Sequence, residues 1–412
     1  MTASVHHTAA IVQGIGHYHA ARFAAARSRV PSLTVVPMIA EMSFSEFAAP
    51  LGDSREFYTP LYLTRKAYRE ALAGGVLRRR LAEVLNEINP SVVAVSGWAE
   101  PESLVAIAWA RRHGKGVVMM SESQAGDGAR SRLRELIKGR VVKCCDAAFV
   151  GGRFHSAYVE ALGMPPEHTF LGYDAVDNAH FESGSDHARK YGQALRRELG
   201  LPARYILACG RFIPKKNFPR LVAAYGRLLA GKKNVPDLVI IGDGPERSVI
   251  EASARAAGVD ARVILPGFRG YDLLPAVYGL ADLFIHVSLV EQWGLVVNEA
   301  ASVGLPLVVS RRCGVAAELV VEGENGLLVD PEDVEGIAIA LASLLERPAD
   351  MLMAMGAASR RIVSAWGVER FADGFSAAVA MAGHGAAPWR AWSALDWAIM
   401  QTLGRWPQHS VP

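Results

Sequence analysis

The chain of 412 residues has 51% hydrophobic residues, 21% charged residues and a formal net charge of +3. This composition excludes a disordered protein, and basic residues dominate no domain in the way that nucleic-acid binding requires. The length is sufficient for two domains with separate hydrophobic cores.

Neither a leader nor a membrane span is evident in the sequence. The first residues lack a basic start and a long apolar stretch, and no apolar run reaches the roughly 18 residues that a membrane helix needs. The four cysteines show no metal-ligand spacing, so we expect reduced core thiols and a cytoplasmic location. They are Cys144, Cys145, Cys209 and Cys313.

Residues 8–13 predict the first strand of a sheet, and two glycines lead from it into a helix. A glycine turn before a helix suits the approach of a phosphate or an acceptor, and a simple tight turn explains the same residues. We therefore take Gly14, Gly16 and His17 as candidates for the acceptor side of a site.

Two helical stretches, residues 61–88 and 130–143, are rich in arginine and lysine. Such charge runs are typical of solvated helix faces. The alternative is peripheral contact with anionic lipid or with a phosphorylated acceptor. Residues 1–200 carry 24 Lys and Arg against 20 Asp and Glu, so the basic residues gather in the first half of the chain.

Further strands are predicted at residues 91–96, 117–120 and 147–150, with helical segments between them. This alternation indicates parallel sheets with helices on both faces, an α/β fold. Glu122 directly follows the strand at 117–120. A small polar stretch separates these elements from those of the second domain. We place the domain boundary there, near residue 190.

The second domain begins with a strand at residues 205–209, followed by Gly210 and Arg211. Lys216 comes five residues after Arg211, and its position just before a helix favours it over Lys215. Two cations at this place are suited to hold a diphosphate leaving group. Two surface cations paired with carboxylates are the alternative.

Two more strands of this domain end in glycine turns. Residues 238–241 run into Gly242, and residues 263–265 lead to Gly267 and Phe268. Such turns let a ligand approach the backbone, although a purely structural turn explains Gly242 equally well.

Residues 281–287 predict a buried strand, and a helix follows from about residue 294. Glu291 lies in the loop and Glu299 lies inside the helix. The free amides at the helix start, from Gly294 through Leu295 to Val296, favour a diphosphate. Glutamates on either side of it are suited to accept hydrogen bonds from sugar hydroxyls, although charged helix faces also produce such pairs by chance.

The surrounding residues resemble the signature of the retaining, family 4 glycosyltransferases (glycosyl transferases group 1). The matching positions are Glu291, Gly294, Glu299, Gly304, Pro306, Gly314, Glu318 and Gly326. The resemblance implies a GT-B fold, in which two Rossmann-like domains with parallel sheets face a cleft.

The same resemblance implies roles for single residues. Glu291 would contact the donor sugar and Glu299 the ribose, and Arg211 and Lys216 would bind the diphosphate. The loop around Gly267 and Phe268 would border the nucleobase. Many relatives carry a histidine where this chain has Glu122, which leaves the preferred sugar and the role of that position open.

We therefore expect an acceptor-binding domain at residues 1–190 and a nucleotide-sugar domain at residues 191–382. The expected reaction transfers a hexose from a nucleotide diphosphate sugar to an acceptor hydroxyl, with retention, in polysaccharide, glycolipid or glycoconjugate synthesis. The acceptor would be a sugar or a lipid-linked sugar. No Asp-x-Asp motif stands at a strand end. We thus expect neither a metal nor a cofactor.

Two rival functions share this architecture. A nucleotide-sugar epimerase would need acid and base side chains in the cleft, and a phosphorylase would need a pyridoxal lysine. The third alternative is a non-catalytic nucleotide-sugar-binding protein, which need not keep cations for a leaving group. Arg211 and Lys216 argue against that alternative.

The tail at residues 383–412 holds four of the eight tryptophans. Its apolar residues recur at helical spacing and predict one apolar face, which would pack on the N-terminal domain or contact a membrane interface. The face comprises Trp392, Leu395, Ile399 and Leu403.

Overall fold

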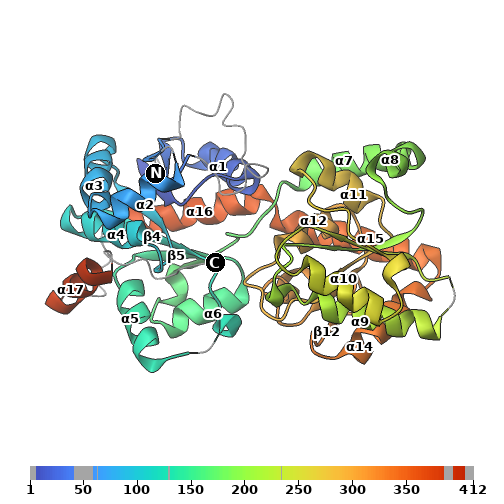
Figure 1. Cartoon of the computed structure of the whole chain (residues 1–412). Coiled ribbons are helices and arrows are strands. Elements are labelled where there is room, and N and C mark those ends of the chain that lie inside the picture. The colour runs from blue at the N-terminus through green and yellow to red at the C-terminus, as the bar shows by residue number, and fades with distance from the viewer. Residues whose placement is uncertain are drawn as a thin grey trace. The chain divides into compact units, whose positions relative to one another are not determined.

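A computed structural model describes residues 6–40, 59–62, 64–128, 130–232, 234–384 and 393–403. The chain forms two compact units, each containing one parallel sheet (Figure 1). The first unit comprises Met1–Ala175 and Val368–Pro412, and the second comprises Val176–Gly367. The predicted α/β fold with two Rossmann-like domains is confirmed.

The sheet of the first unit has the strand order β2-β1-β3-β4-β5-β6, and all neighbouring strands are parallel. Nearly every strand residue is buried, because helices cover both faces of the sheet. The strands are β1 (Thr8–Val12), β2 (Leu33–Pro37), β3 (Val92–Ser96), β4 (Gly116–Ser121), β5 (Ala147–Val150) and β6 (Thr169–Leu171).

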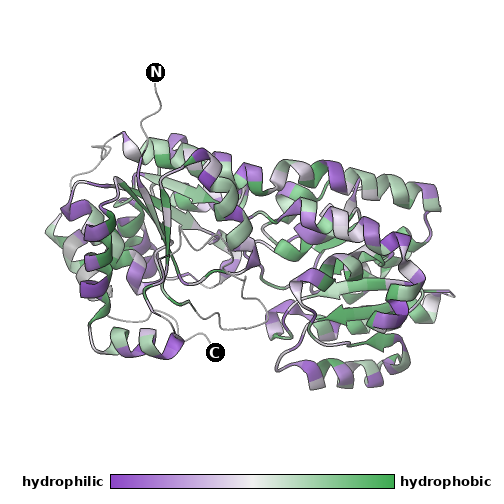
Figure 2. Cartoon of the chain, turned by 90° about the horizontal axis from the view of Figure 1, so that it is seen from above, coloured by the Kyte–Doolittle hydropathy of each residue, from purple (hydrophilic) through white to green (hydrophobic). Residues whose placement is uncertain are grey.

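Two hydrophobic clusters flank this sheet. One packs beneath α2, α3 and α4, and the other packs beneath α1 and α16. Apolar residues in the strands and hydrophilic residues on the outer helix faces account for this layering (Figure 2). The helices are α1 (His17–Arg29), α2 (Arg65–Ala73), α3 (Leu77–Ile88), α4 (Pro101–Arg112), α5 (Arg132–Val142), α6 (Arg153–Ala161), α16 (Val368–Gly383) and α17 (Ala394–Leu403).

The sheet of the second unit has the order β12-β11-β10-β7-β8-β9, again with parallel neighbours. After β9 the chain returns to the other side of β7, so the strand order reverses between β7 and β10. The strands are β7 (Tyr205–Cys209), β8 (Asp237–Ile241), β9 (Val263–Ile264), β10 (Leu283–His286), β11 (Leu307–Ser310) and β12 (Gly326–Val329).

Helices also cover both faces of the second sheet. Those of eight or more residues are α7 (Asn178–Lys190), α8 (Gly192–Leu199), α9 (Phe218–Gly231), α10 (Arg247–Ala256), α12 (Leu295–Ser302), α14 (Val334–Leu345) and α15 (Ala349–Val363). Between them lie the short helices α11 (Leu274–Gly279) and α13 (Ala316–Leu319).

The predicted boundary near residue 190 is displaced, because α7 belongs to the second unit. It packs along α11, where His180 stacks on Tyr271 with ring centroids 4.3 Å apart and Phe181 is fully buried. The predicted end of the second domain at residue 382 is displaced as well. Helix α16 packs on α1, with Phe371 and Phe375 buried in the core of the first unit.

The described part of the tail lies against α4 and α5 of the first unit. Asp396 at the start of α17 is buried and forms an ion pair of 3.2 Å with Arg140 of α5. Leu395, from the predicted apolar face, is 54% exposed. The tryptophans Trp389, Trp392 and Trp406 and the side chains of Trp397 and Leu403 lie outside the described residues.

Within the part of the chain that the structure describes, no helix combines the length and the apolar character needed to cross a membrane.

Candidate active site

The loops that follow β7 and β10 lie where the strand order of the second sheet reverses. In open parallel sheets this position, at the carboxyl ends of the strands, is where ligands bind. Arg211 and Lys216 follow β7, and Glu291 follows β10. The fold thus brings these candidate residues to one edge of one sheet.

Lys216 is held in place by the turn that contains it. It ends a 3₁₀ turn, Pro214–Lys216, and the following Asn217 has a left-handed backbone with φ of 63°. The side-chain amide of Asn217 donates to the carbonyls of Val287, at 3.0 Å, and Pro331, at 2.7 Å. These bonds tie the turn to the end of β10.

The Lys216 ammonium forms an ion pair with the Glu291 carboxylate. Their side chains are only 10% and 12% exposed. Lys215, in contrast, contributes its backbone carbonyl, which accepts from the amide of Leu289 at 2.8 Å. The geometry therefore distinguishes the two neighbouring lysines, and Lys216 faces the site.

Glu291 accepts two further hydrogen bonds on the same carboxylate oxygen. His286 Nε2 lies 3.2 Å away and Ser288 Oγ also 3.2 Å away. Burial alone would raise the pKa of Glu291, but the hydrogen bond from His286 and the charge of Lys216 outweigh burial and hold this pKa well below its usual range. Glu291 is therefore a carboxylate at all physiological pH values.

His286 is neutral in this environment. Its ring is fully enclosed, and burial and the charge of Lys216 lower the pKa of His286 despite the hydrogen bond to Glu291. Because a carboxylate only accepts, the contact with Glu291 favours the tautomer that carries the proton on Nε2. The sequence analysis did not single out His286 or Ser288; the only signal was their position at the end of β10.

Arg211 is exposed, and its guanidinium makes no hydrogen bond or ion pair with another residue that the structure describes. The preceding Gly210 has φ of 152°, and a Cβ there would lie 3.4 Å from the Lys216 side chain. A flexible cation beside a fixed one is suited to grip an incoming phosphate.

Helix α12 begins at Leu295 beside this cluster, and no side chain caps its first amides. Gly294, the N-cap, has φ of 111°, and a Cβ there would lie 3.4 Å from Glu291 Cγ. Leu295 and Val296 are half-buried at the helix start. The positive end of the helix dipole therefore lies next to Glu291, as expected for an anion site.

Glu299 lies in the interior of the second unit. The residue has no exposed surface, and its carboxylate lies near the Tyr278 hydroxyl and the Cys209 thiol. Burial, Cys209 and Glu299 raise the pKa of Tyr278 well above its usual value, and burial and Glu299 raise the pKa of Cys209 to about 12. The two signature glutamates thus occupy different environments.

The glycines after β8 and β9 hold adjacent loops together. Gly242 has φ of 134°, and a Cβ there would lie 2.0 Å from the carbonyl oxygen of Gly210. Its amide donates to the Gly267 carbonyl at 3.1 Å, and the next residue, Phe268, is half-buried. Gly242 is therefore required by the packing of the loops, whether or not a ligand is bound.

The candidates of the first unit are spread over the ends of β1 and β4. Gly14 is half-buried, Gly16 is the N-cap of α1, and His17 is the first residue of that helix. Glu122 follows β4 and lies near Asp174, which is fully buried.

Asp174 and Arg22 were missed by the sequence analysis. Burial and Glu122 raise the pKa of Asp174 well above its usual value, and Arg22 opposes them only in part. Arg22 Nη2 lies 3.8 Å from Asp174, and Arg22 Nε donates to the Ala175 carbonyl at 2.7 Å.

A second buried carboxyl of the first unit, Glu102, was also missed. It accepts hydrogen bonds from Tyr68, at 2.8 Å, and from Gln13, which follows β1. Burial and the neighbouring charge of Glu100 raise the pKa of Glu102 to about 7. No sequence motif marks this residue.

Comparison with family models supports the interpretation of the second unit. Residues 193–362 match the family described as "Glycosyl transferases group 1". Two curated relatives are similar over about half of the chain. The GDP-mannose-dependent alpha-(1-6)-phosphatidylinositol monomannoside mannosyltransferase of Mycolicibacterium smegmatis is 31% identical over 242 residues, 56% of this chain and 60% of that protein.

The D-inositol 3-phosphate glycosyltransferase of Corynebacterium efficiens is 32% identical over 228 residues, 53% of each chain. This chain therefore spans little more than half the length of the curated relatives that it matches.

Solved structures resemble the fold over most of the chain. HepE of Anabaena, in complex with UDP-glucose, has a TM-score of 0.69 at 17% identity, covering 89% of this chain and 97% of that one. The sucrose-phosphate synthase of Thermosynechococcus elongatus has a TM-score of 0.66 at 20% identity, covering 89% and 96%. These likenesses are of fold alone, a GT-B fold with two Rossmann-like domains.

Proposed function

We propose that the chain transfers a hexose from a nucleotide diphosphate sugar to an acceptor hydroxyl, because residues 193–362 match the glycosyl transferases group 1 family. The single observation that carries this proposal is the cluster of Lys216, Glu291 and Arg211 at the reversal of the second sheet. It places two cations and a carboxylate beside the start of α12.

Each part of the cluster has a chemical task in such a transfer. The diphosphate binds at the amides of α12, and Arg211 and Lys216 stabilise the negative charge that grows on it as the glycosidic bond breaks. Glu291, held ionised by His286 and Lys216, accepts hydrogen bonds from the hydroxyls of the donor sugar. Glu299 acts from within α12 on the ribose side.

The proposal extends to stereochemistry and substrates. Transfer proceeds with retention of configuration, which the resemblance to the retaining glycosyltransferases supports. GDP-mannose is the first donor to test, because the mannosyltransferase relatives are named for it. The acceptor is a sugar or a lipid-linked sugar. A lipid-linked acceptor would bring the basic helices of the first unit to a membrane surface.

Incubation with a panel of nucleotide sugars tests the proposal. GDP-mannose, UDP-glucose and their relatives are each incubated with and without a mixture of sugar acceptors, and release of the nucleoside diphosphate is measured. We expect release from at least one donor, faster with acceptor present. Sugar interconversion without release would instead support an epimerase, and binding without either reaction a non-catalytic protein.

A further inference from the structure

His286, the last residue of β10, is a buried polar side chain beside the candidate active site. It is 2% exposed, and its ring lies nearly parallel to that of Phe284, with centroids 6.3 Å apart. Phe284 and His286 share one face of the strand, and both pair with residues of β11. Because β10 is an interior strand between β7 and β11, this ring has a fixed place in the second unit.

The Nε2 atom of His286 lies in a small polar group at the start of the loop to α12. Glu291 Oε2 is 3.2 Å from this nitrogen and Ser288 Oγ is 3.1 Å from it. Ser288 is fully buried, and its hydroxyl donates to the same Glu291 oxygen at 3.2 Å. A Cβ added at Gly294, the N-cap of α12, would lie 3.7 Å from His286 Nε2. His286 thus joins the strand end, the glutamate and the helix start.

The backbone of Glu291 is fixed by different contacts. Its carbonyl accepts from the amide of Gly314 at 3.1 Å, and Glu291 pairs with Cys313 in an isolated parallel bridge. The side chain can still rotate about its own torsions. The direction of the carboxylate therefore depends on contacts with other side chains, including Lys216 and His286.

Donor binding would affect these two side-chain contacts differently. In the proposed reaction, the diphosphate at the start of α12 is a second anionic partner for Lys216, so the ion pair with Glu291 weakens. The imidazole of His286 is enclosed on a strand and offers the diphosphate no charge. The carboxylate of Glu291 would therefore keep its contact with His286 while Lys216 turns to the diphosphate.

Building on the proposed transfer reaction, we propose that His286 is a positioning residue, which holds the Glu291 carboxylate through Nε2 in the direction in which it meets the donor sugar. His286 acts through Glu291 and does not itself contact the substrate. A strand is a suitable place for such a residue, because side chains on rigid elements hold a geometry more precisely than side chains on loops.

Titratable groups surround His286 and Glu291 from the loops after β7 and β11. Burial and the charges of Lys216 and Lys215 lower the pKa of His286, against the influence of Glu291. Burial and Glu291 raise the pKa of Cys313, in the loop after β11, well above its usual value. The imidazole and the thiol are both uncharged at neutral pH. Removing the imidazole therefore removes a hydrogen bond and not a charge.

Two substitutions of His286 separate the hydrogen bond from the packing. His286→Leu keeps a side chain of similar size and removes the donor, whereas His286→Gln places an amide N–H near the position of Nε2. Ile285→Val loosens the neighbouring core position, on the opposite face of β10, and is the control for packing. Circular dichroism checks the folding of each chain. His286→Met, which also lacks a donor, replaces the leucine variant if that variant does not fold.

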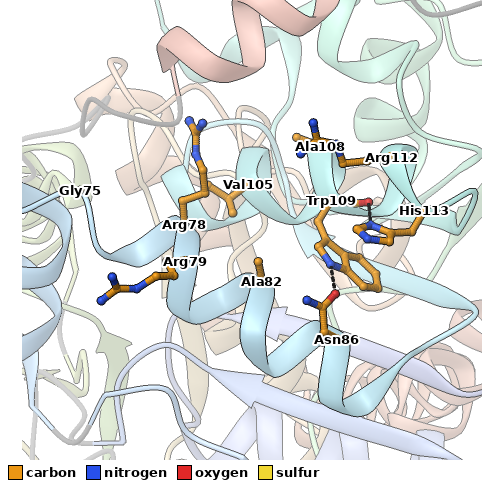
Figure 3. A pocket seen from close by; sticks show the side chains of 10 residues that line it. All are labelled: Gly75, Arg78, Arg79, Ala82, Asn86, Val105, Ala108, Trp109, Arg112 and His113. Carbon is orange, nitrogen blue, oxygen red and sulfur yellow. Dashed lines mark hydrogen bonds between the residues drawn. The ribbon is translucent and has the colours of Figure 1, made fainter.

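A second histidine, in the first unit, offers a control for the loss of an imidazole. His113 lies at a pocket of about 770 Å³ between α3 and α4 (Figure 3). Its Nδ1 is 2.8 Å from the Trp109 carbonyl oxygen, and its ring stacks on the indole with centroids 4.6 Å apart. These contacts are with backbone and an aromatic ring. His113→Leu should therefore behave as wild type in both measurements that follow.

Steady-state rates with the donor that the wild-type chain uses give the first measurement. His286→Leu should lower kcat about tenfold, as expected for the loss of a hydrogen bond to a charged group. The KM for the donor should change by less than about twofold, because the contacts with the nucleotide and the diphosphate remain. His286→Gln should recover most of the loss, and Ile285→Val should stay near wild type.

The second measurement does not depend on turnover. The chain is isotope-labelled at the side-chain carboxyl carbon of glutamate, the Glu291 signal is assigned with Glu291→Gln, and its titration is followed by NMR without nucleotide. The pKa of Glu291 should rise in His286→Leu, because a hydrogen bond to the charged form is lost, and His286→Gln should restore it.

Three results would overturn the proposal: an unchanged kcat in folded His286→Leu, an equal loss of kcat in the leucine and glutamine variants, or a Glu291 titration in His286→Leu that coincides with wild type. A wild-type chain that turns over no donor would contradict the proposed function instead. The Glu291 titration would then decide by itself whether His286 holds the carboxylate.

Discussion

The ammonium of Lys216 and the carboxylate of Glu291 form an ion pair that joins the loop after β7 to the loop after β10. Both side chains are nearly buried, so each depends on the other for compensation of its charge. A bound diphosphate would offer Lys216 a second anionic partner. The pair therefore couples the position of the proposed leaving group to that of the proposed sugar-binding carboxylate.

This coupling predicts a shift in pH dependence. Lys216→Met removes one of the two influences that hold down the pKa of Glu291, so we expect that pKa to rise. The acid limb of the pH profile for transfer should then move to higher pH, because Glu291 gains its proton sooner. Lys215→Met is the matched control and should keep the wild-type limb. Coincident limbs for all three proteins would contradict the coupling.

The two signature glutamates should fail differently when they are changed. Glu291 is proposed to contact the reacting sugar, and Glu299 acts on the ribose side from a buried position. Glu299→Gln should weaken the binding of the free nucleoside diphosphate and of the intact donor alike. Glu291→Gln should leave the binding of the free nucleoside diphosphate nearly unchanged and should lower turnover. Calorimetry and steady-state rates measure both. Equal weakening of the free nucleotide by both changes would refute this assignment.

Glu102 predicts a stability change with pH in the first unit. Its pKa in the folded chain is about 7, above the ordinary value of 4.5, so the folded state binds the proton more tightly than the unfolded state. The tighter proton binding of Glu102 stabilises the folded state fully below about pH 4.5, and this stabilisation is lost as the pH rises toward 7. Glu102→Gln keeps an uncharged group at this position.

Urea unfolding at pH 5 and pH 8 measures this effect. The free energy of unfolding of Glu102→Gln, relative to wild type, should increase by about 2 kcal/mol between the two pH values. The same difference at both pH values would mean that Glu102 is not a titrating buried carboxyl.

Transfer should survive exhaustive treatment with a chelator. In the proposed reaction, Arg211, Lys216 and the amides of α12 would supply the positive charge that a metal ion could otherwise supply, and the sequence has no Asp-x-Asp motif at a strand end. The rate in excess EDTA should equal the rate in magnesium or manganese. Loss of transfer in EDTA, restored by either ion, would contradict this account of the diphosphate site.

Strand positions and the cluster after β7 were accessible to sequence reasoning. Buried parallel strands appear as short apolar runs, and their carboxyl ends meet at one edge of the sheet. The loops that carry Lys216 and Glu291 therefore lie close together, although 75 residues separate the two residues. The residues that directly follow a strand can be identified from the local sequence, without knowledge of how the helices pack.

Features that depend on packing between distant segments were not predictable in the same way. Helix α16 joins the first unit because Phe371 and Phe375 fit against Phe23 and Phe149. The burial of Glu299 depends likewise on its contact with Tyr278, from α11. Asp174 and Glu122 meet only once β4 and β6 are aligned in their sheet.

Turnover of Lys216→Ala at saturating donor shows whether Lys216 stabilises the leaving diphosphate. Release of the nucleoside diphosphate is followed with the donor that the wild-type chain uses, and Lys215→Ala serves as the control. We expect Lys216→Ala to lose roughly 2–4 kcal/mol of transition-state stabilisation, which is about 30-fold to about 900-fold in turnover, with donor affinity changed far less. Lys215→Ala should stay near wild type. Near wild-type turnover of Lys216→Ala, or equal losses in the two variants, would contradict the claim that Lys216 stabilises the leaving diphosphate.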